Sequence, residues 1–205
     1  MIKITKKNPP KWYTSVLKEQ KVERYKQLYS KRRRQLREEL IEEQHKLCAY
    51  CCGKINIDYS IIEHIKPQSL YPELSTDYRN MVASCKGYKR ENSSCGIKKQ
   101  AIYDEHKFIS PLEKDVEENF RYLPNGTIEG LNERARYTIE ILNLNSHHLR
   151  MARKAVFEQY LYIDRHSQKR LQRNETAGKL PAFVNVIRFV IKNRFSQIAK
   201  VKMKL

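Results

Sequence analysis

The chain has 205 residues, which is enough to bury a hydrophobic core as one domain or as a small domain with helical additions. Lysine and arginine outnumber aspartate and glutamate by 41 to 23, and this excess gives a formal net charge of +18. Such a surface predicts a polyanionic partner, first of all nucleic acid, although a soluble protein can also simply be basic. No apolar run approaches the roughly 18 residues of a transmembrane helix, and no amphipathic membrane helix opens the chain, so a membrane partner is not expected.

The cysteine content points to metal binding. The count of five is odd, and four of the cysteines cluster at metal-ligand spacing. The first ten residues lack the apolar segment of a signal peptide. We therefore expect a cytoplasmic protein with reduced thiols.

The N-terminal 46 residues predict an arm followed by a helix. Residues 1–10 alternate briefly between apolar and polar side chains and end at Pro9-Pro10, which is typical of an edge strand or an extended arm. No glycine or proline interrupts residues 11–46, and apolar side chains recur at spacings that fit one helix face: Val22, Tyr25, Tyr29, Leu36 and Leu40. The basic run Lys31–Arg34 interrupts that face, and it is either a solvated surface or a stripe that contacts phosphates.

Two local patterns mark strands in the middle of the chain. Ile61, Ile62 and Ile65 are β-branched and predict a strand that ends at Pro67. Residues 101–119 are expected to form the end of a helix and then a loop. Asn125-Gly126 next predicts a tight hairpin with Tyr122 and Ile128 in its strands.

The C-terminal third is predicted to be helical. One short helix is expected over residues 137–144. A longer one is expected from an N-cap at Asn145 or Ser146 to about Glu175, with an apolar face made by Leu149, Ala152, Val156, Tyr160 and Ile163. Pro181 suits the first turn of a last helix, lined by Val184, Ile187, Ile191, Phe195 and Ile198.

The clustered cysteines predict a structural zinc site. Cys48 and Cys51 form a Cys-x-x-Cys pair, a spacing at which two thiolates can reach one tetrahedral zinc ion. Cys85 and Cys95 supply the second pair across an unusually long loop, and Cys52 is a spare thiol that the register disfavours. Four protein ligands would leave no open coordination position on the zinc for chemistry. The alternative is that these cysteines are simply buried or unpaired and bind no metal.

Between the cysteine pairs lie the groups that suit phosphodiester chemistry. Glu63 and His64 are adjacent, so on a regular strand their side chains point to opposite sides and serve one site only if the backbone twists or bulges. A neutral histidine is a good general base for a water that attacks a phosphodiester. A carboxylate can hold Mg²⁺, which stabilises charge on the phosphate, although such a pair is also common on surfaces.

These residues resemble the HNH endonucleases of the ββα-metal fold. The likeness rests on Cys48-x-x-Cys51, Glu63-His64-Ile65-x-Pro67, Asp77-Tyr-x-Asn80, Cys85 and Cys95-x-x-Lys98. Further phrases resemble the PtuB-type HNH nucleases of Septu and retron anti-phage systems: Met1-Ile-Lys-Ile, Asn8-Pro9-Pro10, Tyr71-Pro72-Glu73-Leu74, Ser110-Pro111-Leu112-Glu113 and Ile141-Leu-Asn-Leu-Asn145.

The resemblance implies a role for each matching residue. His64 would be the general base, Glu63 would bind the catalytic Mg²⁺ or Mn²⁺, and Asn80 would pin the loop that orients the histidine. The sequence departs from the family after Cys95, where Gly96 stands in place of a His or Asn metal ligand. Asn92 is the nearest substitute ligand, and His106 is another.

The resemblance also implies partners and a fold. It implies DNA as substrate, an ATPase of the PtuA type that would meet the N- and C-terminal helices and, in a retron, a reverse transcriptase with its RNA–DNA product. The expected fold is α+β: an N-terminal arm and helix (1–46), an HNH ββα core with zinc and hairpin (47–130) and a C-terminal helical region (131–205). A non-catalytic zinc-dependent nucleic-acid-binding or scaffold protein, and a stand-alone restriction or toxin nuclease, are the alternatives.

Overall fold

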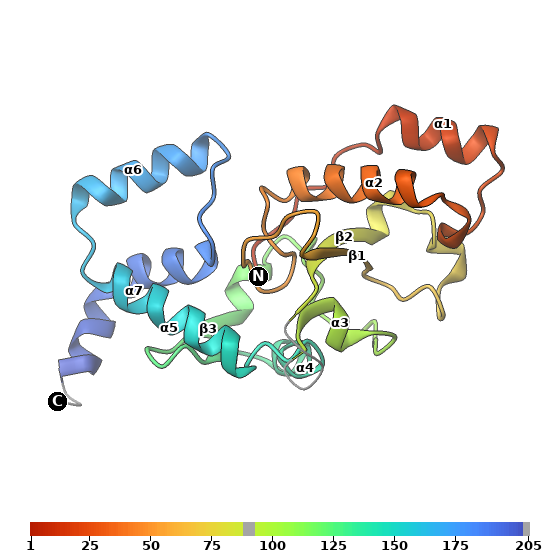
Figure 1. Ribbon diagram of the computed structural model, residues 1–205. Coiled ribbons are helices and arrows are strands. Elements are labelled where there is room, and N and C mark those ends of the chain that lie inside the picture. Colours follow the sequence, from red (N-terminus) through yellow and green to blue (C-terminus); the bar gives the residue numbers. More distant parts are fainter. Residues whose placement is uncertain (88–92, 203–205) are drawn as a thin grey trace.

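The computed structural model describes residues 1–87 and 93–202, and of residues 195–202 it describes only the backbone (Figure 1). Helices and two small sheets make up the chain, in agreement with the α+β expectation. The elements are α1 (Lys11–Glu19), α2 (Ser30–Glu43), β1 (Ser60–His64), β2 (Met81–Cys85), α3 (Cys95–Lys99), β3 (Phe120–Tyr122), β4 (Ile128–Gly130), α4 (Glu133–Ile141), α5 (His147–Leu161), α6 (Arg165–Thr176) and α7 (Val184–Lys202). Short 3-10 helices lie at Tyr25–Gln27, Pro72–Leu74, Tyr78–Asn80 and Val116–Asn119.

The first sheet pairs β1 with β2 and carries the residues of chemical interest. The strands are antiparallel, with Ser60 opposite Cys85 and His64 opposite Met81. Helix α2 packs along both strands, and the short α3 packs on β2 (Figure 1). Strand, strand and short helix therefore follow one another along the central segment.

The second sheet is the predicted hairpin. Strands β3 and β4 are antiparallel, with Tyr122 opposite Ile128. In the turn, the Asn125 side chain accepts a hydrogen bond from the Thr127 N–H at 3.0 Å. Gly126 has a φ of 81°, and a Cβ there would lie 1.9 Å from the Arg150 carbonyl oxygen, so the approach of the turn to α5 requires glycine.

The N-terminal residues form an extended arm without a strand. The Ile4 N–H donates to the Pro111 carbonyl at 2.8 Å. Further along, the Lys7 N–H donates to the Glu43 carboxylate at 2.7 Å, and the Lys6 ammonium pairs with the same carboxylate. The arm thus fixes the C-terminal end of α2 beside the central segment.

The prediction of one helix over residues 11–46 is wrong. Helix α1 ends at Glu19, Lys21 takes a left-handed φ of 49°, and α2 begins only at Ser30. The chain turns without the glycine or proline that would mark a break, because Lys21 itself adopts the left-handed conformation. As a result Val22 is buried whereas Tyr29 is 67% exposed, so the two do not share a helix face.

The C-terminal helices also differ from the prediction. The long helix is two helices, because Asp164 caps a new one by accepting a hydrogen bond from the Ser167 N–H at 2.9 Å. The buried face of α5 consists of Leu149, Arg153, Phe157 and Leu161. The predicted face missed Arg153, whose buried guanidinium donates to the Gly126 and Leu144 carbonyls.

The ends of the flanking helices are shifted as well. Helix α4 begins at Glu133 instead of residue 137, because Asn132 caps it through the Ala135 N–H. Helix α7 begins at Val184, three residues after Pro181, since Phe183 has a left-handed φ of 54°. Val184 and Ile187 are buried as predicted, whereas the side chains of Phe195 and Ile198 lie outside the described residues.

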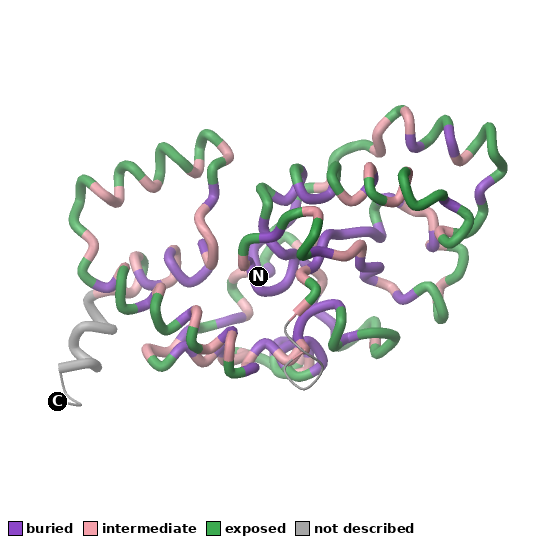
Figure 2. The backbone as a smooth tube through the Cα atoms, in the orientation of Figure 1, coloured by how far each residue is buried: buried purple, intermediate pink, exposed green. Residues whose placement is uncertain are grey.

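One large apolar cluster joins the three predicted segments, since it includes Leu36 of α2, Met81 of β2 and Phe157 of α5. Helix α6 contributes no buried residue and lies at the end of the molecule away from α1 and β1 (Figure 2). No helix in the described part of the chain is long and apolar enough to span a membrane.

Candidate active site and metal centre

Four cysteine thiols converge where three parts of the chain meet. Cys48 and Cys51 lie in the turn that follows α2, Cys85 ends β2, and Cys95 begins α3. Their sulfur atoms all lie within 4.8 Å of one another, and those of Cys51 and Cys85 are 4.0 Å apart. A tetrahedral zinc ion with bonds of ~2.3 Å places its sulfur ligands about 3.8 Å apart. The cluster can therefore hold a metal ion, and all four predicted ligands take part.

The surroundings of the cluster favour one thiolate, at Cys48, whereas hydrogen bonds to the neighbouring thiols raise the pKa of Cys51 and Cys95. The Cys85 N–H donates to the Cys48 sulfur at 3.3 Å, and the Gly53 N–H donates to the Cys51 sulfur at 3.4 Å. Burial opposes ionisation of Cys48, but hydrogen bonds from Cys51, Cys85 and Cys95 outweigh it and lower the pKa of that thiol. No cysteine is in a disulfide. Four sulfur donors complete a tetrahedron, so a metal bound here would be structural.

Cys52 is not part of this cluster. Its side chain is fully buried in a separate apolar group with Ile2, Leu47, Leu180 and Val184. Cys52 therefore lies outside the group of four cysteines that the sequence register favoured.

A buried ion pair occupies the carboxylate that the sequence assigns to the catalytic metal. The Lys99 ammonium donates to Glu63 Oε1 at 2.8 Å and to the His64 carbonyl at 3.2 Å. The lysine side chain is completely buried, and that of Glu63 is 9% exposed. Burial raises the pKa of the Glu63 carboxyl, although the Lys99 ammonium favours its charged form. A fixed cation thus already neutralises this carboxylate.

Gly96 lies directly against the other oxygen of the same carboxylate. A Cβ at this position would be 2.7 Å from Glu63 Oε2 and 3.1 Å from the Ser84 hydroxyl. This is the position after Cys95 where the family places a ligand. The missing side chain is therefore the space into which the Glu63 carboxylate fits.

His64 is buried and held through both ring nitrogens. Its Nε2 lies 2.9 Å from the Ser75 carbonyl, and its Nδ1 lies 3.1 Å from the Gln68 amide nitrogen. A carbonyl only accepts, so Nε2 carries the proton and Nδ1 accepts from Gln68. Burial lowers the pKa of His64 below its usual value, which favours the neutral imidazole. The Tyr25 ring packs edge-on against the imidazole, with the centroids 5.2 Å apart.

Asn80 closes the loop that carries these contacts. Its Oδ1 accepts from the Lys66 N–H at 2.8 Å, and its Nδ2 donates to the carbonyls of Lys66 at 3.0 Å and of Leu74 at 3.3 Å. Lys66, two residues after β1, is therefore tied to Asn80, the residue just before β2. This geometry suits the loop-pinning role that the resemblance implied, because the tied loop includes Gln68 and Ser75.

The side chains of Glu63 and His64 do not bind a common partner. The pairing of β1 with β2 is regular through both residues, so the two side chains leave the strand in opposite directions. Glu63 contacts α3, whereas His64 contacts the loop over residues 68–75. Their shared neighbour is Lys99, which binds the carboxylate of one and the backbone of the other.

Few of the described residues could act as ligands of a catalytic metal ion. Asn92, the predicted additional ligand, lies outside the residues that the structure describes. His106 is exposed in a turn after α3. Glu63 is therefore the carboxylate on which a divalent ion would depend. Mg²⁺ is commonly bound by one or two carboxylates together with water and substrate phosphates. The residues therefore fit this ion if the Lys99 ammonium moves away from the Glu63 carboxylate.

Sequence reasoning missed several residues of this site. Lys99 is the most important, since the motif singled out the exposed Lys98 beside it. Gln68, Ser75 and Tyr25 contact His64 but carry no motif of their own. The one available signal was the position of Gln68, four residues after His64 and just past Pro67, within the loop that Asn80 closes.

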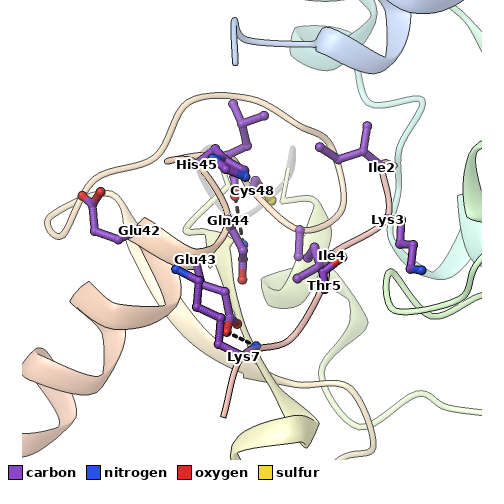
Figure 3. Close-up of a pocket in the computed structure, with 12 residues that line it drawn as sticks. Ile2, Lys3, Ile4, Thr5, Lys7, Glu42, Glu43, Gln44, His45 and Cys48 are labelled. Atoms are coloured by element: carbon purple, nitrogen blue, oxygen red, sulfur yellow. Dashed lines mark hydrogen bonds between the residues drawn. The ribbon is translucent and has the colours of Figure 1, made fainter. Parts of the chain in front are cut away.

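A separate cavity of about 260 Å³ lies beside Cys48 (Figure 3). The N-terminal arm and the end of α2 line it, with Ile2, Glu43 and Cys48 on its wall. Figure 3 shows the Lys7 backbone hydrogen-bonded to Glu43 among the residues that line this cavity. Neither Glu63 nor His64 lines it, so the cavity belongs to the docking of the arm.

No family model matches the chain. Among curated proteins, it is 34% identical over 138 residues to the "Retron Vc95 putative HNH endonuclease" of Vibrio cholerae serotype O1 biovar El Tor. That alignment covers 62% of this chain and 66% of the Vibrio protein. The chain is also 28% identical over 108 residues to the "Septu protein PtuB" of Bacillus thuringiensis, covering 52% of this chain and 39% of that protein. In both cases the chain spans less than two thirds of the relative's length.

Proposed function

The chain belongs to the HNH endonucleases of the PtuB and retron type, and on this basis we propose that it cleaves DNA phosphodiester bonds in a metal-dependent reaction. In this proposal β1, β2 and α3 form the ββα core of residues 47–130, between the N-terminal segment 1–46 and the helical segment 131–205. The orientation of His64 carries the proposal. A buried, neutral imidazole whose Nε2–H is fixed by a carbonyl presents its Nδ1 as a base.

The residues of this chain supply the base and its alignment. A water that replaces the Gln68 amide at Nδ1 gives up its proton there as its oxygen bonds to phosphorus and the bond from phosphorus to the leaving oxygen breaks. Ser75 keeps the proton on Nε2, and Asn80 holds the loop on which Ser75 and Gln68 lie. General-base catalysis of this kind contributes roughly 10²- to 10⁴-fold to the rate.

Two metals complete the proposal. Cys48, Cys51, Cys85 and Cys95 would hold a structural zinc ion. Glu63, with Asn92 as a further candidate, would hold the catalytic Mg²⁺ or Mn²⁺. Because its side chain leaves β1 on the side opposite to His64, this assignment requires the strand to twist or bulge there when substrate binds. That ion supplies charge stabilisation at the scissile phosphate and at the leaving oxygen.

The names of the relatives support a place in anti-phage defence. We propose that the chain is the nuclease effector of a complex with a PtuA-type ATPase and, where a retron is present, with a reverse transcriptase and its RNA–DNA product. A cytoplasmic location suits five cysteines that form no disulfide.

The Lys99–Glu63 pair favours a second candidate, a zinc-dependent nucleic-acid-binding scaffold without turnover. A cation of the protein already occupies the carboxylate that the reaction would need. The two candidates differ in whether His64 matters for DNA cleavage.

The deciding experiment incubates plasmid DNA with Mg²⁺ or Mn²⁺ and the purified protein, alone and with its ATPase partner. His64→Ala is compared with His147→Ala, which removes an exposed histidine instead. We expect His64→Ala to lower the cleavage rate by about 10²-fold or more and His147→Ala to leave it unchanged. Equal cleavage by wild type and His64→Ala would exclude the mechanism, and no cleavage by wild type under any of these conditions would favour the scaffold.

A further inference from the structure

Helix α6 has an unusual position in the fold. It contributes no buried residue, yet both of its ends are anchored. Asp164 caps its first turn, Glu175 in its last turn pairs with Arg188 at 3.3 Å, and the following Gly178 carbonyl lies 3.0 Å from His45 Nδ1. The structure therefore holds in place a helix that adds little to the core.

The charges of α6 are sorted onto one face. At about 100° per residue, the basic side chains fall within an arc of about 140°: Arg165, His166, Lys169, Arg170 and Arg173. All five are exposed. The half-buried side chains lie on the opposite face: Ser167, Gln168, Leu171 and Glu175. The single acidic residue of the helix thus points away from the basic face.

The four lysine and arginine side chains on this face are free to bind a partner. Within the described part of the chain, none of Arg165, Lys169, Arg170 and Arg173 forms an ion pair. The basic run at the start of α2 behaves differently. Arg32 lies over the Trp12 ring, Arg33 lies over the Tyr25 ring, and Arg34 pairs with Glu38. The predicted phosphate-contacting stripe at Lys31–Arg34 is thus largely engaged within the fold.

The chemistry of the α6 face selects the class of partner. Leu171 is the only strongly apolar residue of α6, so the helix has no apolar face with which to enter a membrane. Arginine guanidinium groups match phosphate oxygens with paired donors, and four cations over about 12 Å of helix suit a dense row of phosphates.

We propose that the exposed basic face of α6, formed by Arg165, Lys169, Arg170 and Arg173, is a docking surface for the phosphate backbone of double-stranded DNA, remote from the Glu63–His64 site. This inference rests on the proposed nuclease function for the identity of the polyanion. Figure 1 shows α6 at one end of the molecule and β1 towards the other. The face would therefore hold the DNA at a distance from the point of cleavage, raising affinity without touching the reacting atoms.

The test measures binding of a fluorescent DNA duplex by anisotropy at several salt concentrations. The α6 variant changes Arg165, Lys169, Arg170 and Arg173 to Gln. The matched control changes four exposed basic residues elsewhere to Gln: Lys3, Lys11, Lys114 and Arg136. Each variant removes four positive charges from the formal +18, leaving +14. The two proteins therefore differ only in where the charge was lost.

We expect the α6 variant to bind DNA roughly tenfold or more weakly near 100 mM salt, and the slope of log affinity against log salt to flatten by about 3 to 4. The control should change affinity by less than about twofold. In cleavage assays KM should rise while kcat at saturating DNA stays unchanged. Circular dichroism checks folding, and the charge-preserving variant Arg165→Lys, Arg170→Lys, Arg173→Lys should retain most of the binding.

Three results would overturn the inference: unchanged affinity and salt slope in the α6 variant, an equal loss in the control, or loss of ATPase binding while DNA binding is unaffected. If wild type does not cleave DNA but its binding still depends on α6, the proposed function fails and the docking surface stands. If wild type cleaves DNA with no dependence on α6, only the docking surface fails.

Discussion

The cysteine cluster and the Glu63 site lie side by side and differ in how their buried negative charges are neutralised. In the first, four thiols converge on one point, where a bound metal ion would neutralise their thiolates. In the second, the carboxylate already has its cation, because the Lys99 ammonium is buried against it. The difference suggests that one site is built to keep a metal permanently and that the other can do without one until substrate arrives.

The link between the two sites is α3. Cys95 begins this helix and Lys99 ends it, so a helix of five residues carries a ligand of one site and the cation of the other. Gly96 lies between them and leaves room for Glu63. Loss of the cysteine cluster should therefore disturb the Glu63 site, whereas changes at Glu63 should leave the cluster intact.

The largest expected effect is the loss of the metal at the cysteine cluster. Cys48→Ser should unfold the protein at 25 °C, because structural zinc contributes on the order of 10 kcal/mol in small domains and a typical domain has only about 5–15 kcal/mol of stability. Thermal unfolding and zinc content check this. Cys52→Ala is the control, since it removes a buried thiol outside the cluster and should keep its zinc. A folded, zinc-free Cys48→Ser protein would contradict the structural role.

The next effect concerns Lys99. Lys99→Met leaves the Glu63 carboxylate buried without a partner and should destabilise the fold by about 3–5 kcal/mol. Lys98→Met, on the exposed neighbour, should change stability by less than about 0.5 kcal/mol. Urea unfolding measures both.

Adding Glu63→Gln to Lys99→Met sharpens this comparison. The double variant removes both buried charges and should recover much of the loss. Mn²⁺ should also stabilise Lys99→Met more than wild type, because the freed carboxylate can bind it. A Lys99→Met protein as stable as wild type would show that the pair does not form in solution.

A smaller effect is expected at Asn80. Asn80→Ala removes three hydrogen bonds and leaves the buried loop groups of Lys66 without a side-chain partner, so it should cost about 2–3 kcal/mol. Cleavage should fall together with stability, since the loop holds the partners of His64. Asn125→Ala, which removes one exposed turn contact, should cost under about 1 kcal/mol and leave cleavage unchanged. Normal cleavage by Asn80→Ala would separate the loop from catalysis.

The smallest effect is expected at Gly96. Gly96→Ala places a methyl group 2.7 Å from the Glu63 carboxylate and should cost about 1–3 kcal/mol as the carboxylate shifts. Because that shift loosens the contact with Lys99, the Gly96→Ala and Lys99→Met effects should not be additive. A double-mutant cycle with zero coupling would show that Gly96 acts independently of the ion pair.

Prediction from the sequence was most successful for residues whose spacing is constrained by their chemical role. Four cysteines, a Glu-His pair and a following asparagine can be read from residue types, and the structure gives Asn80 and the cysteines the contacts expected of them. The hairpin at Asn125-Gly126 was equally accessible, because few residues tolerate that turn.

The other features could not be predicted, because they depend on tertiary contacts that leave no signal in the local sequence. A buried lysine cannot be told from an exposed one in the run Lys98-Lys99, since only the position of Glu63 decides which is covered. Arg153 is buried for a similar reason, because it meets carbonyls contributed by distant turns. The end of α1 could not be predicted, because the chain turns at Lys21, a non-glycine residue in the left-handed conformation. The break before Arg165 was missed because the apolar spacing continues through it, although Asp164 caps a new helix there.

The most direct measurement of the separation between the two sites is the ratio of zinc to protein in wild type and in the Glu63→Gln, Lys99→Met double variant. We predict about one zinc per chain in both proteins, because we expect the ion at the cysteine cluster, which can hold a metal, and not at the Glu63 site. A ratio well below one in wild type, or the loss of zinc in the double variant alone, would contradict the account.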